Sequence, residues 1–275
     1  MNVQTATAEA VSGDRYHDLF DTELYLKNFY VEECPLSTFV RNTLANVLKS
    51  GRINGTRLLD LGSGPTIAHH VILSKYFNEL AFSDLTEKNR EALRKWRDGE
   101  AGAFDWDSTF KCVAALEGEE ENWMALKESF RNKMRTIYPC DLRNPNPLHP
   151  VLSKPFDCVT STFCLEAACS DDVTFDRVIR NVTSLLKDGG HLIIVNSLRQ
   201  SAYIVGDVHF SSRSLEKEEY IRSLKSAGLD EISWYEGEES AGDHLSNSSG
   251  VYVIVAKKNP PNPPIFEACL KVPSA

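Results

Sequence analysis

Residues 58–65 of this chain read Leu58-Leu59-Asp60-Leu61-Gly62-Ser63-Gly64-Pro65. The apolar start of this stretch predicts a short buried strand, of the kind found in parallel sheets that are covered on both faces. The two glycines allow a turn in which the backbone can approach a ligand closely. A strand that passes through such a turn into a helix is typical of a nucleotide-type cofactor site on a parallel sheet.

Polar side chains follow the other strands that the sequence predicts. Asp84 comes 24 residues after Asp60, and Asp141, Thr162 and Asn196 follow later apolar runs. The carboxyl ends of parallel strands meet at one edge of a sheet, where ligands of open α/β sheets bind. We therefore expect the glycine turn and these four residues to converge on one cleft.

The rest of the chain alternates between strand and helix patterns. The predicted strands cover residues 57–61, 79–83, 135–140, 156–161, 191–195, 232–236 and 251–256. The predicted helices cover residues 35–48, 66–77, 86–98, 175–186 and 216–227, and we expect the Lys187-Asp188-Gly189-Gly190 string to end the fourth of them. This alternation predicts an α/β fold with an open, mostly parallel, Rossmann-like sheet that closes on a pair of strands.

The length of 275 residues suits one large domain. We expect a single domain over residues 1–259, in which residues 1–50 form an N-terminal segment and helix and residues 99–135 form an insertion. Residues 260–275 contain five prolines and are expected to form a tail.

The bulk composition excludes several classes of function. A net charge of −9 would repel phosphate backbones, so we expect no nucleic-acid partner. No apolar run approaches the roughly 20 residues that span a bilayer, and the first residues lack the pattern of a secretory signal. The seven cysteines are odd in number and unclustered, which predicts reduced thiols, a cytoplasmic location and no metal site.

The glycine turn discriminates between cofactors. A dinucleotide fingerprint would have a third glycine where this chain has Ile67, and no Lys-Ser/Thr pair follows to make a phosphate-binding loop. A nicotinamide-dependent enzyme is therefore disfavoured, and a ligand without a pyrophosphate fits better. Asp84 can accept from two ribose hydroxyls, and Asp141 with the Leu142 backbone can hold an adenine. These features indicate S-adenosylmethionine.

Several longer strings carry a resemblance to one family. They are Tyr25-Leu26-Lys27-Asn28-Phe29-Tyr30, Asp60 to Thr66, Phe104-Asp105-Trp106, Ser161 to Cys169, Leu185 to Gly190 and Gly250 to Lys258. With these strings the chain resembles the small-molecule amine N-methyltransferases, which include nicotinamide, indolethylamine, phenylethanolamine and thioether methyltransferases. The resemblance runs from about Tyr16 to Lys258. It implies a class I methyltransferase sheet, mostly parallel with an antiparallel last strand, and an N-terminal helical lid.

The resemblance also implies a cofactor site. The residues that would contact S-adenosylmethionine are Tyr25, Tyr30, Gly62, Ser63, Asp84, Asn89, Asp141, Leu142 and Thr162. The two tyrosines would close over the cofactor, one of them near its carboxylate. This chain departs from the family at Ala68, where a tyrosine commonly touches the cofactor.

The same resemblance implies an acceptor site. Its residues would be Phe163, Glu166, Asn196, Ser197, Gln200, Tyr203, Ser212 and Asn247. Asn196 stands where nicotinamide methyltransferases have an aspartate, and Gln200 stands where phenylethanolamine methyltransferases have a glutamate. Glu166 is the remaining acid and the candidate catalytic base.

These features predict an S-adenosylmethionine-dependent enzyme that methylates a small amine or pyridine nitrogen. One alternative is transfer to a sulfur, selenium or oxygen acceptor, as the thioether branch suggests. Another is a non-catalytic member that binds the cofactor and regulates a partner, because Ala68, Asn196 and Gln200 all lack the family's functional group. We expect a monomer whose partner is a small-molecule acceptor.

Overall fold

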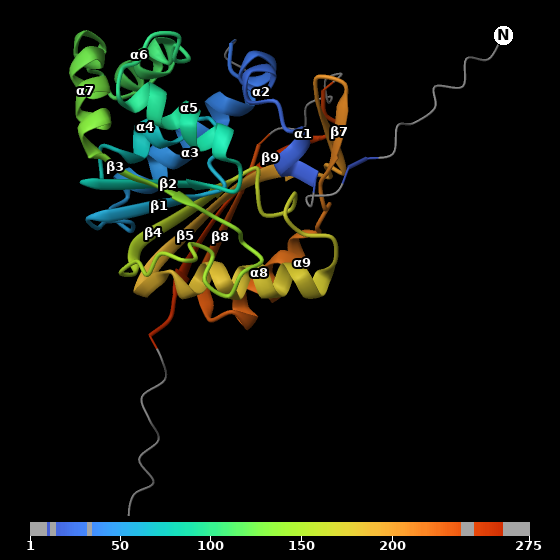
Figure 1. Cartoon of the computed structure of the whole chain (residues 1–275). Coiled ribbons are helices and arrows are strands. Elements are labelled where there is room, and N and C mark those ends of the chain that lie inside the picture. Colours follow the sequence, from blue (N-terminus) through green and yellow to red (C-terminus); the bar gives the residue numbers. More distant parts are fainter. Residues whose placement is uncertain (1–9, 12–14, 32–34, 238–244, 261–275) are drawn as a thin grey trace, which may run out of the picture.

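A single twisted sheet organises the computed structural model, which describes residues 10–11, 15–31, 35–237 and 245–260 (Figure 1). Seven strands lie in the order β3-β2-β1-β4-β5-β9-β8. Their bounds are β1 Arg57–Leu61, β2 Glu79–Asp84, β3 Met134–Pro139, β4 Phe156–Thr162, β5 Leu186–Leu198, β8 Leu229–Glu236 and β9 Gly250–Lys258. All seven predicted strands are present, and the predicted fold class is confirmed.

The register places the glycine turn near the middle of the sheet. β1 pairs in parallel with β2 on one side and with β4 on the other. β9, the last strand in chain order, runs antiparallel to both of its neighbours, β5 and β8. The strands that carry Asp84, Thr162 and the turn therefore end at one edge, as the sequence predicts.

Helices cover both faces of the sheet (Figure 1). One face carries α3 Pro35–Lys49, α4 His70–Leu73, α5 Glu87–Arg97, α6 Asp107–Leu116, the short 3-10 helix η2 Glu120–Asn122 and α7 Trp123–Lys133. The other face carries α8 Asp172–Ser184 and α9 Lys217–Ser226. Local signals set their starts: the Asp171 side chain caps α8, and Glu216 forms a capping box with Glu219 at the start of α9.

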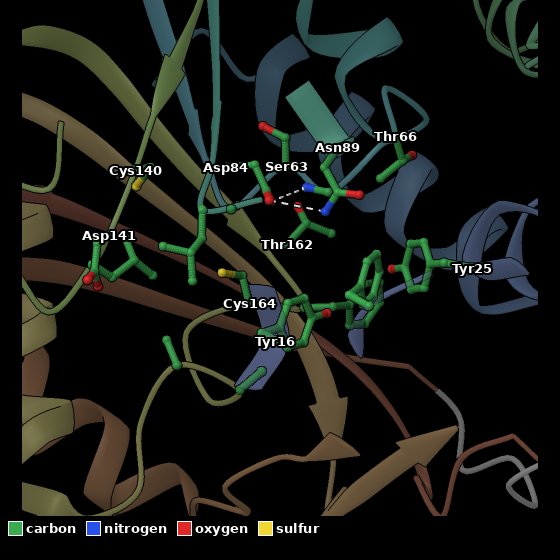
Figure 2. Close-up of a pocket in the computed structure, with 18 of the residues that line it drawn as sticks. Tyr16, Tyr25, Ser63, Thr66, Asp84, Asn89, Cys140, Asp141, Thr162 and Cys164 are labelled. Carbon is green, nitrogen blue, oxygen red and sulfur yellow. Dashed lines mark hydrogen bonds between the residues drawn. The ribbon is translucent and has the colours of Figure 1, made fainter. Parts of the chain in front are cut away.

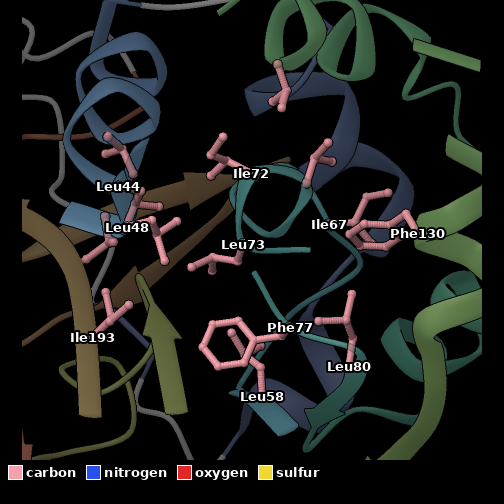
Figure 3. Packing of buried hydrophobic residues seen from close by; sticks show 14 of the residues in the cluster. Leu44, Leu48, Leu58, Ile67, Ile72, Leu73, Phe77, Leu80, Phe130 and Ile193 are labelled. Carbon is pink, nitrogen blue, oxygen red and sulfur yellow. The ribbon is translucent and has the colours of Figure 1, made fainter. Parts of the chain in front are cut away.

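Successive side chains of β1 point to opposite faces of the sheet, so the hydrophobic core is divided into one cluster on each face. Leu58 packs into the cluster under α3 and α4, whereas Leu59 packs into the cluster under α8 and α9. In the first cluster, shown in Figure 3, Leu58 and Leu80 of the sheet lie against the α4 region and Phe77. Both clusters consist mainly of buried aliphatic and aromatic side chains, so the sheet edge that carries the turn has rigid support on each side.

The helix predicted over residues 66–77 is much shorter in the structure. Only His70–Leu73 is α-helical, because Thr66 Oγ1 accepts from the Ala68 amide in a local turn before it. After it, the Lys75 and Tyr76 amides bond three residues back, which is the tighter spacing of a helix end.

The prediction that Lys187 to Gly190 ends a helix was also wrong. α8 ends at Ser184, and these residues belong to β5, where the pairing with β4 shifts between Phe156 and Cys158. A Cβ at Gly190 would lie 2.9 Å from the Lys187 carbonyl oxygen and 3.0 Å from that of Asp157. The glycine therefore permits a strand irregularity rather than a helix end.

A small aromatic layer lies beside the edge that carries the turn. It comprises α1 Tyr16–Leu19, α2 Thr22–Phe29 and a hairpin of β6 Ala202–Val205 and β7 Val208–Ser211 that the sequence analysis did not predict. Phe20, Val205 and Phe210 are its buried centre. Among the described residues, no helix is both long and apolar enough to cross a membrane.

Candidate active site

A cavity of about 780 Å³, open solvent at its mouth included, lies at the carboxyl ends of the central strands (Figure 2). Its lining residues are Tyr16, Phe20, Tyr25, Gly62, Ser63, Gly64, Thr66, Asp84, Leu85, Asn89, Cys140, Asp141, Leu142, Arg143, Thr162, Phe163, Cys164, Ala167 and Ala168. Of the nine predicted cofactor residues, only Tyr30 is not part of this lining.

The glycine turn forms the floor of this cavity. Gly62 and Gly64 have φ angles of 67° and 59°, a backbone conformation that favours glycine. A Cβ on Gly62 would lie only 2.0 Å from Cys164 Sγ. Gly62 is therefore required both by its backbone conformation and by the close approach of the segment after β4.

Asp84 is the best-placed carboxylate in the cavity. It is 6% exposed, and its Oδ2 accepts from the Gly64 amide at 2.8 Å. Its Oδ1 accepts from the Thr86 amide at 2.8 Å and from Asn89 Nδ2 at 3.1 Å. Burial raises the pKa of Asp84, and these hydrogen bonds oppose that shift. These donors hold Oδ2 toward the turn and Oδ1 toward the start of α5.

Asn89 connects this carboxylate to the N-terminal helix. Its side chain is fully buried, and its Oδ1 accepts from Thr22 Oγ1 at 2.7 Å. Thr22 is the first residue of α2, whose N-terminus is capped by Asp21. A continuous chain of hydrogen bonds therefore runs from α2 through Asn89 to Asp84.

Asp141 lies farther along the cavity, past the end of β3. Its Oδ1 accepts from Arg143 Nε at 3.1 Å and from the Arg143 amide at 3.0 Å. Leu142 is buried beside it, and Asn181 Nδ2 donates to the Leu142 carbonyl at 3.0 Å. Arg143 also lines the cavity, and the sequence analysis missed it because a loop arginine has no pattern that distinguishes a site residue from a solvated one.

Aromatic side chains from the N-terminal segment close one side of the cavity. Tyr25 was predicted there, whereas Tyr16 and Phe20 were not, although their helical neighbours carried the family resemblance. The hydroxyls of Tyr16 and Tyr203 contact each other, which joins this segment to the β6–β7 hairpin. Tyr30 lines a second cavity instead, next to Ala68.

Glu166 lies beside the cavity rather than in its lining. It is 2% exposed, and its Oε1 accepts from Tyr252 at 2.8 Å and from the Tyr220 hydroxyl. Burial raises the pKa of Glu166, while hydrogen bonds from Tyr220, Asn196 and Tyr252 oppose the shift. Its Oε2 has no hydrogen-bond partner among the residues that the structure describes. The next two residues along the chain line the cavity.

Most predicted acceptor residues lie outside the cavity lining. Asn196 is one of them, so the expectation that it converges on this cavity was wrong. The Asn196 side chain is hydrogen-bonded to buried Glu166 instead. Its register partner on β9, Tyr252, donates to the same carboxylate. Of the predicted acceptor residues, Phe163 is the one that lines the cavity, and its φ is positive at 52°. The remaining ones are Ser197, Gln200, Tyr203, Ser212 and Asn247, located on the end of β5 and around the β6–β7 hairpin.

Hydrogen bonds hold the hairpin region together. Gln200 Nε2 donates to Ser246 Oγ at 2.6 Å, and Asn247 Oδ1 accepts from the Ser201 and Ala202 amides at 3.0 and 3.2 Å. These side chains orient the loop before β6. Their roles toward an acceptor stay predictions.

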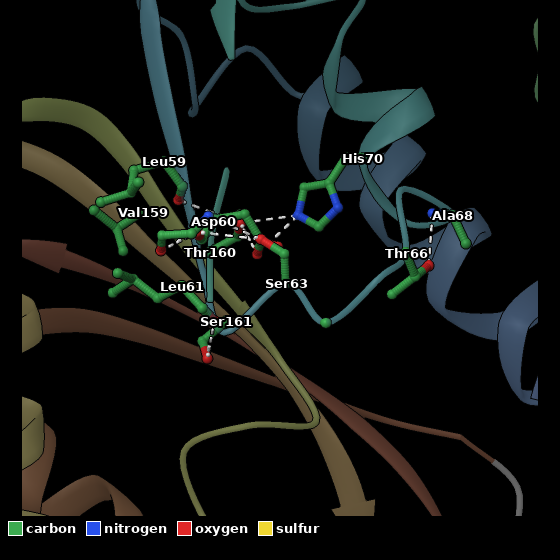
Figure 4. Close-up of polar contacts among 12 residues, drawn as sticks. Leu59, Asp60, Leu61, Ser63, Thr66, Ala68, His70, Val159, Thr160 and Ser161 are labelled. Atoms are coloured by element: carbon green, nitrogen blue, oxygen red, sulfur yellow. Dashed lines mark hydrogen bonds and ion pairs between the residues drawn. The ribbon is translucent and has the colours of Figure 1, made fainter. Parts of the chain in front are cut away.

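A buried polar cluster supports the turn from behind (Figure 4). His70 Nε2 lies 2.9 Å from Asp60 Oδ1, which also accepts from Thr160 Oγ1 at 2.8 Å. The Asp60 carbonyl accepts from Ser83 Oγ at 2.8 Å. The cluster thus fixes the ends of β1, β2 and β4 relative to α4. Among the described residues, no group of His, Cys, Asp or Glu is arranged to hold a metal ion.

Solved structures with this fold include several methyltransferases. The magnesium protoporphyrin IX methyltransferase of Synechocystis PCC 6803, solved with bound SAM, aligns with a TM-score of 0.54 at 14% identity, over 92% of this chain and 100% of that one. The N-methyltransferase NodS of Bradyrhizobium japonicum, solved with S-adenosyl-L-homocysteine, aligns with a TM-score of 0.51 at 14% identity, over 87% and 99%. These structures agree with this chain in fold.

Proteins related in sequence are much more similar to this chain than these solved structures are. The chain is 35% identical to indolethylamine N-methyltransferase of Oryctolagus cuniculus, over 90% of this chain and 97% of the relative. It is also 35% identical to nicotinamide N-methyltransferase of Homo sapiens, over 90% and 96%. Phenylethanolamine N-methyltransferase of Bos taurus is 33% identical, over 74% and 76%. The NNMT/PNMT/TEMT family matches residues 8–259, and the chain therefore belongs to this family.

Proposed function

We propose that this protein transfers the methyl group of S-adenosylmethionine to the nitrogen of a small amine or pyridine. The observation that carries the proposal is the cavity in which the glycine turn, Asp84 and Asp141 lie together. Asp84 binds the ribose hydroxyls, and Asp141 with Leu142 binds the adenine. Gly62 and Ser63 then line the methionine part, and Thr162 receives its amino group. The sequence relatives named above are indolethylamine, nicotinamide and phenylethanolamine N-methyltransferases, which supports this assignment.

The reaction is a direct displacement. The nitrogen lone pair attacks the methyl carbon, the carbon–sulfur bond breaks with its electron pair on sulfur, and S-adenosylhomocysteine leaves. Because the sulfonium already activates the methyl group, the protein contributes alignment and exclusion of water. The aromatic residues Tyr16, Phe20 and Tyr25 exclude water from the cavity.

The attacking nitrogen must be unprotonated. An aliphatic ammonium has to lose a proton first, whereas a pyridine nitrogen is largely neutral at pH 7. Glu166 is the proposed acceptor of that proton, through a water, since burial raises the pKa of its carboxyl toward the range of an effective base. Glu166→Gln is expected to slow methylation of an aliphatic amine about 100-fold and to leave a pyridine substrate nearly unchanged. Equal losses on both acceptors would exclude this role.

The acidic net charge of −9 supports a protein without a nucleic-acid partner. We further propose a monomer in the cytoplasm. Light scattering of the purified protein and fractionation of expressing cells test these two statements.

Calorimetry tests the cofactor and a product assay tests the acceptor. The protein is titrated with S-adenosylmethionine, and then nicotinamide, tryptamine, phenylethanolamine and a thioether are added in turn while S-adenosylhomocysteine is measured. Asp84→Asn removes the carboxylate proposed to bind the ribose hydroxyls, so this variant should bind the cofactor more weakly than wild type. Turnover on one acceptor supports the proposal. Turnover only on a thioether would assign a sulfur acceptor, and absence of cofactor binding would overturn the assignment of the cavity.

A further inference from the structure

The buried carboxyl of Glu166 receives hydrogen bonds from three elements that are far apart in the sequence. Tyr220 of α9 and Tyr252 of β9 both donate to its Oε1, and the side chain of Asn196 on β5 is hydrogen-bonded to the same carboxyl. Its Oε2 has no partner among the residues that the structure describes. The two tyrosine hydroxyls therefore share one oxygen, and the other oxygen is left without a donor.

Aromatic packing fixes the two tyrosine rings. The ring of Tyr220 meets Phe175 of α8 edge-on, with ring centroids 5.0 Å apart, and the ring of Tyr252 stacks on Trp234 of β8 at 4.4 Å. The two tyrosine rings also lie edge-on to each other at 5.8 Å. Both tyrosines are buried, so neither hydroxyl can leave the carboxyl without disturbing this packing. The two donors are thus held in place before any ligand binds.

The three side chains that hydrogen-bond to Glu166 are all neutral. Arg213, which follows β7, donates its backbone amide to the Glu166 carbonyl at 3.1 Å, but its guanidinium pairs with Asp172. The thiols of Cys164 and Cys169 belong to the same segment as Glu166, and burial raises the pKa of both, so they carry no charge at pH 7. The ionised form of Glu166 therefore depends on neutral donors, which favour a carboxylate over a carboxylic acid.

The oxygen without a donor indicates where a proton can arrive. A buried carboxylate oxygen with no partner is costly, and such an atom commonly marks the position of a water or a ligand. Phe163, Ala167 and Ala168, on either side of Glu166 in the chain, line the cavity of the proposed cofactor. A water between Oε2 and that cavity would complete the hydrogen bonding of the carboxyl and connect it to a bound acceptor.

We propose that Tyr220 and Tyr252 are positioning residues for Glu166: by occupying Oε1, they assign proton transfer to Oε2. This inference rests on the proposed function, in which Glu166 is the base. An aliphatic ammonium loses a proton to the connecting water, its N–H bond breaking with the electron pair on nitrogen, while the water gives a proton to Oε2. The neutral amine then attacks the methyl group, and the carboxyl releases the proton to solvent before the next turnover. Neither tyrosine lines the cavity, so both act through Glu166.

Removal of one hydroxyl at a time tests this role. Tyr220→Phe and Tyr252→Phe each delete a donor and keep the packed ring, and either variant is sufficient if the other does not fold. Tyr235→Phe is the matched control, because its hydroxyl accepts from Arg52 at 2.7 Å and its ring packs on the opposite face of the sheet. For each protein, kcat/KM is measured against pH with nicotinamide and with whichever of tryptamine and phenylethanolamine wild type methylates. Infrared difference spectra against the matching Glu166→Gln variant follow the protonation of this carboxyl without turnover.

The acidic limb of the amine profile should move to higher pH by about one unit in each tyrosine variant, because one hydrogen bond to the ionised carboxyl is lost. Below the limb the rate on the amine should fall about tenfold, and above it the rate should return to near the wild-type value. The limb for nicotinamide should not move, since a pyridine nitrogen needs no base. The infrared titration should show the same upward shift, and Tyr235→Phe should match wild type in every measurement.

An amine limb that stays in place in the folded tyrosine variants would overturn the positioning role, as would equal shifts with the two acceptors. Methylation of nicotinamide alone by wild type would leave Glu166 without a proton to accept, and would overturn the inference while the proposed function stands. Failure of wild type on every acceptor would instead count against the proposed function. In that case the infrared titration still decides, since an unshifted Glu166 in both variants would show that the tyrosines do not hold its carboxylate.

Discussion

Gly62 combines two constraints that are usually found at separate positions. Its φ of 67° favours glycine, and the space where a Cβ would be is taken by Cys164 Sγ, only 2.0 Å away. The first constraint comes from the turn itself and is visible in the sequence. The second depends on how the segment after β4 packs on the turn, which no local pattern reveals.

Replacement of Gly62 by alanine should therefore cost more than its backbone strain. We expect Gly62→Ala to lower stability by about 2–4 kcal/mol and to abolish cofactor binding, because the turn or the Cys164 segment must move. Gly118→Ala is a matched control, since Gly118 has a φ of 69° with no atom within 4 Å of the added Cβ. Denaturant unfolding and calorimetry on both variants measure the difference. Equal destabilisation would show that the contact with Cys164 is unimportant.

The buried carboxyl of Glu166 gives stability a predictable dependence on pH. Burial raises the pKa of Glu166 in the folded protein, so the folded state keeps the proton at pH values where the unfolded chain has lost it. Its stabilising contribution is thus complete at low pH and is lost as the pH rises through the folded pKa.

Glu166→Gln removes this titration while an amide oxygen still accepts from Tyr252. The variant should match wild type near pH 4 and should exceed it in stability at pH 8. Urea midpoints at the two pH values test this. Parallel pH profiles for the two proteins would show that folding does not shift the pKa of Glu166.

At the scale of elements, the strands were more predictable than their connections. All seven strands of the large sheet were predicted because buried strands are apolar runs bounded by polar turns, and the residues at the ends of the parallel ones followed from their pairing. The β6–β7 hairpin and α1 were missed, since each is short and is stabilised by the other: Tyr16 of α1 packs on Phe210 of β7. The acceptor residues predicted around this hairpin could not be placed for the same reason.

The element that couples to the cofactor site is α2. Thr22 Oγ1 donates to Asn89, which in turn donates to Asp84, so the position of α2 and the carboxylate of Asp84 are linked. Thr22→Val should weaken cofactor binding about fivefold, as loss of one hydrogen bond does, with little change in global stability. Thr22→Ser retains the hydroxyl and should bind as wild type does. Calorimetry gives the affinities, and faster hydrogen exchange in α2 of the valine variant would locate the change. An unchanged affinity would show that α2 and Asp84 are independent.

At the scale of the whole molecule, residues 99–135 share the core that supports the site. Phe110 of α6 stacks on Trp96 of α5 with ring centroids 5.9 Å apart, and it meets Phe130 of α7 edge-on at 5.7 Å. The sequence predicted this segment as an insertion because it is polar overall. Its few buried aromatic residues nevertheless connect it to the helices on the sheet.

Phe110→Ala should therefore destabilise the entire protein by about 3–5 kcal/mol, in one transition. Tryptophan fluorescence and far-ultraviolet circular dichroism should report the same midpoint, and cofactor binding should disappear with it. Ala115→Gly, on the same helix, is a control for helix propensity alone and should cost about 1 kcal/mol. Two separate transitions in Phe110→Ala would make residues 99–135 an independent folding unit.

The location of β9 has a consequence for the order in which the protein can be assembled during synthesis. β9 leaves the ribosome after β5 and β8, yet it lies between them and supplies both with hydrogen bonds. Until Gly250–Lys258 has emerged, β5 has an unpaired edge and β8 has no partner in the sheet. The nascent chain thus carries an unpaired strand edge between the synthesis of β5 and that of β9, which makes chaperone binding and the speed of translation over this interval determinants of yield.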